Sequence, residues 1–173
     1  MVTKELIFEL MTGPSAETYN ALMRAVVAEP DFNLRAEELD VLWRQFEAGD
    51  LAGVQRDLRG AIRLWIHNPE MHVLASAVAR RLGDQVTAEM EAHFARCCYL
   101  GMLATGDGSL ERPYQVARVA DEYALLRHLK KSWDRQTMLH RDGRVVDAFE
   151  CSDGASLHFQ LPKADLLTGR ALA

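Results

Sequence analysis

Three side chains that commonly bind metal ions follow one another along a single predicted helix. Glu89, His93 and Cys97 are spaced four residues apart, so a helix over 87–103 places a carboxylate, an imidazole and a thiol on one face. All three are competent ligands for zinc or iron. One helix supplies no closed ligand shell, however, and a packing histidine beside a buried cysteine explains the same pattern. We therefore predict no bound metal and no cofactor.

The segment Gly106-Asp107-Gly108-Ser109 has the composition of a phosphate-binding loop. A P-loop requires a preceding strand and a lysine that reaches the phosphates, whereas this segment follows a predicted helix and contains no lysine. The alternative is a helix end closed by a left-handed glycine, with Asp107 bonded to nearby backbone amides. A nucleophilic Cys97 or Cys98 lacks the strand–turn–helix context that such residues use. The motifs thus predict no catalytic residue.

The first hundred residues alternate between helical periodicity and short breakers. The predicted helices cover residues 2–11, 16–28, 34–48, 51–66, 70–82 and 87–103. Glu29-Pro30 and Asn68-Pro69 end two of them, because the residue before proline avoids helical dihedrals. His67 and His72 flank the second break, and we interpret them as surface residues at a turn.

A repeated dipeptide organises this helical region. Gly49-Asp50 is followed 34 residues later by Gly83-Asp84, and a predicted helix begins after each. This is the period of the tetratricopeptide (TPR) repeat, in which small residues such as Ala88 and Ala95 let paired helices approach closely. The bulky signature positions of that repeat match poorly. We therefore predict TPR-like antiparallel helical hairpins over residues 1–104.

The pattern changes after Ala104. Alternation predicts strands, and helical spacing predicts one helix capped by Asp121; the strands are 114–119, 136–140, 144–150 and 157–161, and the helix is 122–131. Asp142-Gly143 and Asp153-Gly154 supply the positive φ of hairpin turns. The predicted fold class is α+β, with a small β-α-β-β-β unit in residues 105–173. The end of the helix over 87–103 is the expected cover of its sheet, so the two regions form one composite domain or two small ones.

Charge and cysteine content exclude several classes of protein. The chain carries 10 basic and 15 acidic residues up to Ala104, and 10 of each after it. Neither part has the positive surplus that nucleic-acid binding requires. No apolar run approaches the ~20 residues of a membrane span, and Glu5 and Glu9 interrupt any secretory h-region. Three cysteines, two of them adjacent, favour a reducing compartment. We expect a cytoplasmic protein that binds neither nucleic acid nor membrane.

An ordered series of short motifs resembles a known bacterial family. The motifs are Asp31-Phe32-x-Leu34-Arg35, Glu91-Ala92-His93-Phe94, Gly106-Asp107-Gly108-Ser109, Tyr114-x-Val116, Glu122-Tyr123-x-x-Leu126, Gln136-x-x-Leu139 and Asp147. Together they resemble the bacterial domain of unknown function numbered 4919 over roughly residues 30–165. The chain has Ser109 where that family often has lysine, and Arg144 and Val146 where it often has histidine and tyrosine. The family has no assigned activity, so the resemblance constrains the fold more than the function.

The polar members of this series are candidates for a shared ligand site. They are Asp107, Glu122, Tyr123, Gln136 and Asp147. A cleft between the helices and the sheet is a usual place for a ligand, and paired carboxylates suit acid–base chemistry or a hard cation. Simpler roles are open for two of them: Glu122 as a first-turn acid favoured by the helix dipole, and Asp147 as a strand-edge charge.

Two hypotheses about function follow. The first is a non-enzymatic protein-interaction module, in which a helical face binds a protein partner and Trp43 and Trp65 serve as anchors. The acidic helical part favours a basic partner, and exposed apolar ends of an incomplete helical stack favour a homodimer. The alternative is an enzyme, or a binder of a small ligand or metal, with its carboxylate-lined site at the helical–sheet junction.

Overall fold

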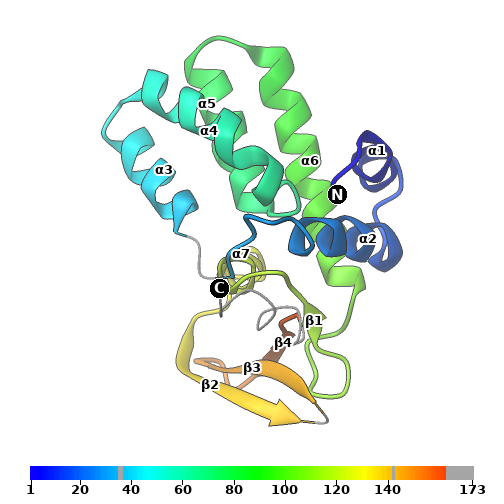
Figure 1. The fold of residues 1–173 in the computed structure, drawn as a ribbon. Coiled ribbons are helices and arrows are strands. Elements are labelled where there is room, and N and C mark those ends of the chain that lie inside the picture. Colours follow the sequence, from blue (N-terminus) through cyan, green and yellow to red (C-terminus); the bar gives the residue numbers. More distant parts are fainter. Residues whose placement is uncertain (35–36, 142, 163–173) are drawn as a thin grey trace.

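The computed structural model describes residues 1–34, 37–141 and 143–162, and these residues form seven helices and four strands (Figure 1). The helices are α1 (Lys4–Thr12), α2 (Ala16–Val27), α3 (Glu38–Glu47), α4 (Leu51–Trp65), α5 (Pro69–Arg81), α6 (Gln85–Ala104) and α7 (Val119–His128). The strands are β1 (Tyr114–Gln115), β2 (Trp133–Arg141), β3 (Arg144–Cys151) and β4 (Ser156–Gln160). The predicted α+β class is confirmed. None of the described helices has the apolar run that a bilayer span requires.

Two helical hairpins make up the middle of the chain. α3 turns into α4 at Gly49-Asp50, and α5 turns into α6 at Gly83-Asp84. In both turns the glycine adopts a positive φ, 82° and 80°, which would strain a residue with a side chain. Each aspartate then caps the following helix by accepting a hydrogen bond from an amide in its first turn. The repeated Gly-Asp dipeptide therefore forms the same turn and the same helix cap in both hairpins.

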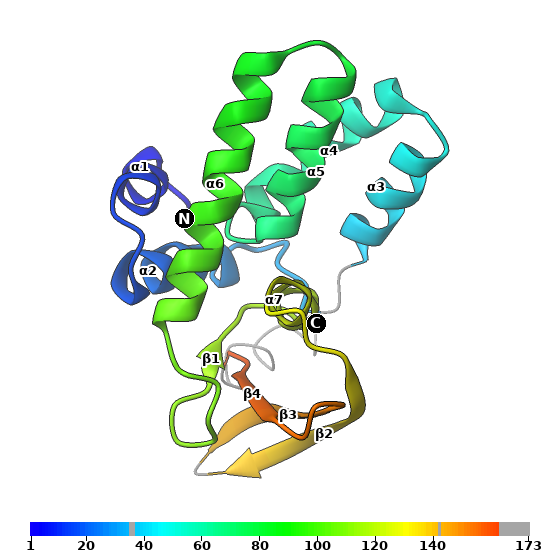
Figure 2. The same cartoon turned by 180° about the vertical axis from the view of Figure 1, so that it is seen from behind.

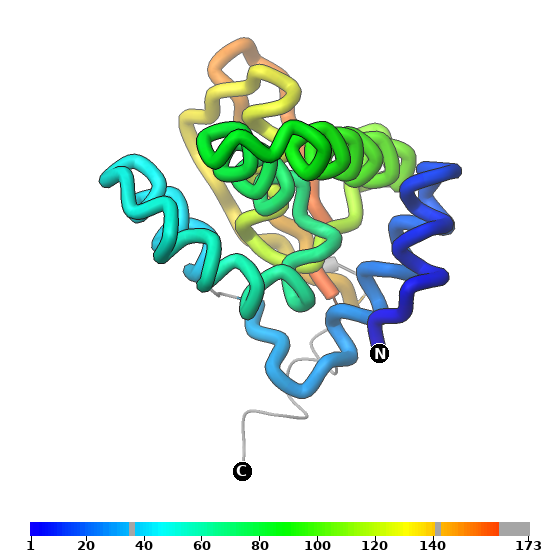
Figure 3. Tube along the Cα trace, turned by 90° about the horizontal axis from the view of Figure 1, so that it is seen from above, coloured from blue at the N-terminus to red at the C-terminus, as the bar shows by residue number. Residues whose placement is uncertain are grey.

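Helix α6 connects the hairpins to the sheet. Figure 2 shows it running from the α5–α6 turn down to the strands, and Figure 3 shows α1 and α2 on one side of the helical part and α3 on the other. A Cβ atom on Gly101 would lie 2.8 Å from the Cβ of Tyr19, so glycine is what allows α6 to approach α2 this closely. The resulting core is continuous from α1, α2 and α6 into the strands.

The strands form one mixed sheet in the order β1-β4-β3-β2. β1 pairs with β4 in parallel, and the other two pairings are antiparallel. The β2–β3 and β3–β4 turns contain Gly143 and Gly154 at φ of 70° and 84°, as hairpin turns of this kind require. Phe149 of β3 packs edge-to-face on Phe159 of β4 and on Tyr123 of α7. Helix α7 thus lies between the sheet and the other helices (Figure 1).

Several predicted boundaries differ from the structure near α7. The strand predicted over 114–119 has only the two residues of β1, because α7 begins at Val119, three residues before the predicted start. β2 in turn begins three residues earlier than predicted. The sheet is covered by α7 as well as by the end of α6, which was the expected cover. Arg35, Asp142 and residues 163–173, all of which carried predictions, lie outside the described residues.

The start of α7 is joined to the α4–α5 turn by one buried carboxylate. Asp121 is 0% exposed. Its Oδ2 accepts hydrogen bonds from the amides of Ala117 and Arg118 at 2.9 and 2.8 Å and lies 3.2 Å from His67 Nε2. Its Oδ1 accepts a bond of 2.6 Å from Asn68 Nδ2. Burial favours a higher pKa for Asp121, but His67, Asn68 and Arg118 outweigh it and hold the pKa below its ordinary value.

Arg118 is the second buried charge of this junction. It is 1% exposed, and its guanidinium carbon lies 4.3 Å from the ring centroid of Phe32 and 4.5 Å from that of Trp65. Burial lowers the pKa of Arg118, while the charges of Asp121 and Glu38 act in the opposite direction. Cation–π contacts on two rings and two nearby carboxylates offset only part of the cost of burial, because Nε and Nη1 of Arg118 have no hydrogen-bond partner among the described residues.

Asp121→Ala tests this junction. We expect the free energy of unfolding at pH 7 to fall by about 3 kcal/mol, since two amides and two side chains lose their acceptor. Because the folded-state pKa of Asp121 is lowered, its contribution is present above the unfolded-state pKa and is lost as the pH falls through the folded-state pKa. Urea unfolding at neutral and acidic pH measures both effects.

The matched control is Asp107→Ala, which removes an exposed loop carboxylate. We expect a loss of about 1 kcal/mol or less from this control. Equal losses for the two variants at pH 7 would show that Asp121 contributes no more to the free energy of unfolding than an exposed carboxylate does.

Candidate functional site

Four of the five residues predicted for a ligand site lie next to one another, where α7 packs on β2 and β3. Tyr123 Oη donates a hydrogen bond of 2.9 Å to Gln136 Oε1, and Gln136 Nε2 donates one of 2.9 Å to Asp147 Oδ2. Glu122 lies beside Asp147 and interacts with its carboxyl group. We call these four residues the polar chain, because they connect an exposed strand edge to a buried interior.

The inner end of the polar chain is a pair of buried carboxyl groups. Glu122 is 0% exposed and Asp147 is 2% exposed. Both side-chain oxygens of Glu122 and Oδ1 of Asp147 have no hydrogen-bond partner among the described residues. Burial, reinforced by the neighbouring Asp147, raises the pKa of Glu122 to about 10. At pH 7 Glu122 therefore keeps its proton.

The outer end of the polar chain reaches a cavity between α3 and α7. The Tyr123 ring stacks on Trp133, with centroids 5.3 Å apart, and Gln136 is exposed. Tyr123 also lines a cavity of about 300 Å³ whose other lining residues are Leu34, Glu37, Leu39, Asp40, Val119, Ala120 and Arg127. Of the four residues in the polar chain, only Tyr123 lines this cavity.

Asp107, the fifth predicted residue, does not join the polar chain. Its Oδ1 accepts a hydrogen bond of 3.0 Å from the Ser109 amide, and its Oδ2 lies 3.5 Å from Arg112 Nη1. Hydrogen bonds from Ser109, assisted by Arg112, lower the pKa of Asp107. Its loop also contains Gly108 at a φ of 79°. The structure therefore places Asp107 in a turn that satisfies its own polar groups.

The two tryptophans proposed as partner anchors occupy different environments. Trp65 is 1% exposed and packs on the Arg118 guanidinium, so its ring offers no surface to a partner in this structure. Trp43 is half-buried and meets Phe46 edge-to-face at 5.8 Å. Both belong to the apolar cluster that holds α3, α4 and α5 together.

The face of α6 that carries Glu89, His93 and Cys97, which was considered for a metal ion, makes local and packing contacts. His93 Nε2 lies 3.0 Å from the Met11 carbonyl oxygen and 3.5 Å from Cys97 Sγ. Glu89 accepts a hydrogen bond of 2.7 Å from Gln85. Within the part of the chain that the structure describes, no three or more His, Cys, Asp and Glu side chains are grouped in a way that suits a metal ion.

The interpretation of His67 and His72 as surface residues is wrong. They are 0% and 1% exposed. His72 Nδ1 lies 2.6 Å from Glu91 Oε2, its Nε2 lies 2.8 Å from the Ile66 carbonyl oxygen, and its ring stacks on Phe94. The proline break marks the turn correctly, but the acidic partners of these histidines come from distant helices. No local sequence signal identifies such partners.

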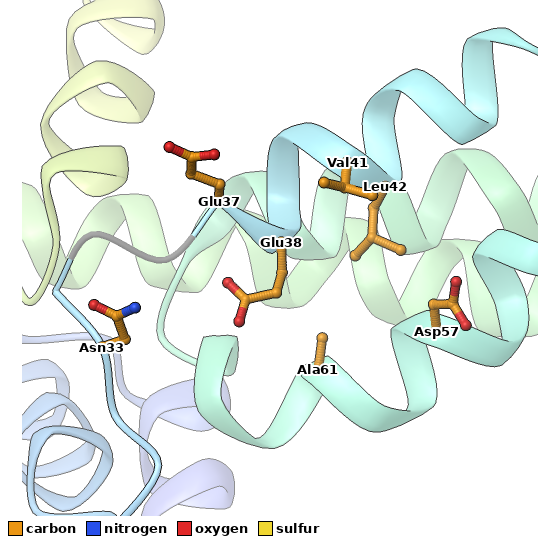
Figure 4. Close-up of a pocket in the computed structure, with 7 residues that line it drawn as sticks. All are labelled: Asn33, Glu37, Glu38, Val41, Leu42, Asp57 and Ala61. Atoms are coloured by element: carbon orange, nitrogen blue, oxygen red, sulfur yellow. The ribbon is translucent and has the colours of Figure 1, made fainter.

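A further cavity lies between α3 and α4. It has a volume of about 520 Å³ and is lined by Asn33, Glu37, Glu38, Val41, Leu42, Asp57 and Ala61. Figure 4 shows the two glutamates where α3 begins, and Asp57 on α4 at the other end of the lining, beyond Ala61. Among the described residues that line it, three are acidic and none is basic. The α3–α4 cavity therefore combines a partly apolar wall with negative charge.

Comparisons of this chain with protein-family models, with curated proteins and with solved structures give no match. The resemblance to domain 4919 consequently rests on the ordered motifs of the sequence alone. The chemistry of the polar chain and of the α3–α4 cavity is what supports a function for this molecule.

Glu122→Gln tests the protonation of the polar chain. Folded Glu122 keeps its proton up to a pKa of about 10, whereas its ordinary value is 4.5. The folded state therefore binds more protons than the unfolded state between these values, and the free energy of unfolding falls as the pH rises. A glutamine keeps the shape and stays neutral, so the variant should be more stable than wild type by about 2 kcal/mol at pH 8.5.

Urea unfolding between pH 5 and pH 9 measures this difference. Glu111→Gln, an exposed loop substitution, is the control and should follow the wild-type profile. Parallel profiles for Glu122→Gln and wild type would mean that Glu122 does not hold a proton in the folded state.

Proposed function

We propose that this protein is a non-enzymatic interaction module and that the α3–α4 cavity binds a basic segment of a protein partner. The cavity is the observation that carries this proposal, because it joins about 520 Å³ of space with three acidic side chains. A lysine or arginine lays its aliphatic stem on apolar surface and keeps its charged end beside carboxylates. Val41 and Leu42 would receive the stem, and the carboxylates of the lining would attract the charged end.

The acidic side chains around the cavity differ in how many interactions they already make with other residues. Asp57 accepts hydrogen bonds from Gln45 and Arg56, and Glu38 contributes to balancing buried Arg118. Glu37 caps no amide of α3 with its side chain. Glu37 is therefore the acidic group whose replacement should change binding with the least effect on folding.

The helical arrangement supports the same proposal. Two successive hairpins, each turned at a Gly-Asp pair, follow the spacing that led us to propose TPR-like packing. Such stacks commonly present grooves to extended or helical segments of other proteins. The free, buried cysteines Cys97, Cys98 and Cys151 support a cytoplasmic location, because reduced thiols are the rule there. The ordered motifs support a relationship to domain 4919.

A small-ligand site at the helical–sheet junction is the alternative. Its support is the unpartnered, buried carboxyl pair of Glu122 and Asp147. Neither residue lines the cavity that Tyr123 reaches, so a ligand in that cavity would contact the pair only through Tyr123 and Gln136. Acid–base chemistry on a substrate requires direct contact or one bridging water. The geometry therefore favours the interaction module.

A pair of short synthetic peptides tests the proposal. One alternates lysine with leucine, and the other replaces each lysine with glutamate. We expect the basic peptide to bind, the acidic one not to bind, and the affinity to fall with added salt. Backbone amide shifts in an NMR titration should concentrate on α3 and α4. Glu37→Lys should weaken binding of the basic peptide about tenfold.

Glu47→Lys is the matched control, since it makes the same charge change at the other end of α3 and does not line the cavity. It should change affinity by less than about twofold. Equal effects of the two variants, or shifts that avoid α3 and α4, would reject the cavity as the binding site.

A further inference from the structure

The sheet has one long open edge. β2 is nine residues long and occupies the end of the strand order β1-β4-β3-β2. β1, at the opposite end, has two residues and contacts α6. Among the described residues, no strand pairs with the outer side of β2, and Figure 2 shows it at the margin of the sheet. A strand in this position presents a row of backbone N–H and C=O groups to another strand.

We propose that the outer edge of β2 binds β2 of a second copy of this chain, antiparallel, with the two-fold axis at Thr137. The two sheets would then continue into one another as eight strands. This proposal concerns a surface separate from the α3–α4 cavity, so it does not depend on the proposed function.

The charge pattern of β2 is the reason for choosing a second copy. With the axis at Thr137, each residue pairs with the one equally far on the other side, so Asp134 lies opposite His140 of the second copy, twice by symmetry. Charged residues on an edge strand normally oppose pairing. Here the carboxylate of Asp134 meets an imidazole that can donate a hydrogen bond to it, so this pair does not oppose pairing as two like charges would.

Neighbouring registers lose this complementarity. An axis at Gln136 places Asp134 opposite Met138, and an axis at Met138 places the residue opposite Asp134 beyond the end of β2 at Arg141. An axis between two residues would join opposite faces of the two sheets, because side chains alternate along a strand. The Thr137 axis uses the full length of the strand.

The same register shelters an exposed apolar side chain. Met138 is 51% exposed. It pairs with Asp147 of β3, so the two side chains lie on the same face of the sheet. In the proposed dimer it lies opposite Gln136 of the second copy, with the two Met138 side chains diagonal to each other across the axis. Diagonal neighbours of this kind are within reach of long side chains.

Charge variants at Thr137 test both the dimer and its register. Thr137 is exposed and is the one residue that faces itself. Thr137→Lys and Thr137→Glu should each raise the dimer dissociation constant about fivefold, because like charges oppose each other at the axis. An equimolar mixture should form a heterodimer at concentrations where each variant alone is monomeric. Sedimentation equilibrium on the full chain measures all four samples, wild type included.

Ser156→Lys and Ser156→Glu are the controls, since Ser156 is exposed on β4 and separated from the β2 edge by β3. These variants should dimerise as wild type does, and circular dichroism confirms that every variant is folded. A wild-type chain that stays monomeric up to millimolar concentration would overturn the proposal. A dimer unaffected by the Thr137 variants, or a mixture that does not restore association, would also overturn it.

Discussion

The arrangement of this molecule depends on the desolvated carboxylate of Asp121. A fully buried charge is costly unless its hydrogen bonds are satisfied, and here two amides, an amide side chain and an imidazole surround it. Two of these groups belong to the start of α7 and two to the α4–α5 turn. If α7 moved away from the α4–α5 turn, the Asp121 carboxylate would therefore lose two of its four hydrogen-bonding groups. This constraint makes one structure of two sequence regions with different periodicity.

The position of the polar chain follows from that constraint. Because Asp121 points toward the α4–α5 turn, Glu122 and Tyr123, the next two residues of α7, point toward the sheet. Glu122 lies beside Asp147 in the interior, and burial together with this neighbour keeps its proton bound. Tyr123 faces the strand edge and reaches Gln136. The carboxyl pair is thereby shielded from the surface, while the acidic cavity between α3 and α4 is open to solvent.

Much of the fold can be predicted from the sequence, because its turns are marked by local chemistry. Gly49-Asp50 and Gly83-Asp84 each supply a glycine with positive φ for the turn and an aspartate that caps the next helix. Both features depend only on neighbouring residues. The contacts of Asp121 span 53 and 54 residues and have no local signal, so its carboxylate was expected to be an ordinary cap. Trp65 shows the same limit: it was expected to be an anchor for a partner, and no local signal indicates that Arg118 covers its ring. The ordered motifs named the members of the polar chain, while only the tertiary structure separates Asp107 from them.

Native-state hydrogen exchange tests most directly whether the Asp121 junction makes the helical and strand regions one cooperative unit. The slowest amides of α5 and of β3 should exchange with the same opening free energy and the same dependence on denaturant, since both require global unfolding. Distinct opening free energies, with β3 exchanging while α5 stays protected, would contradict the account, because the sheet would then open without breaking the junction that is said to hold it.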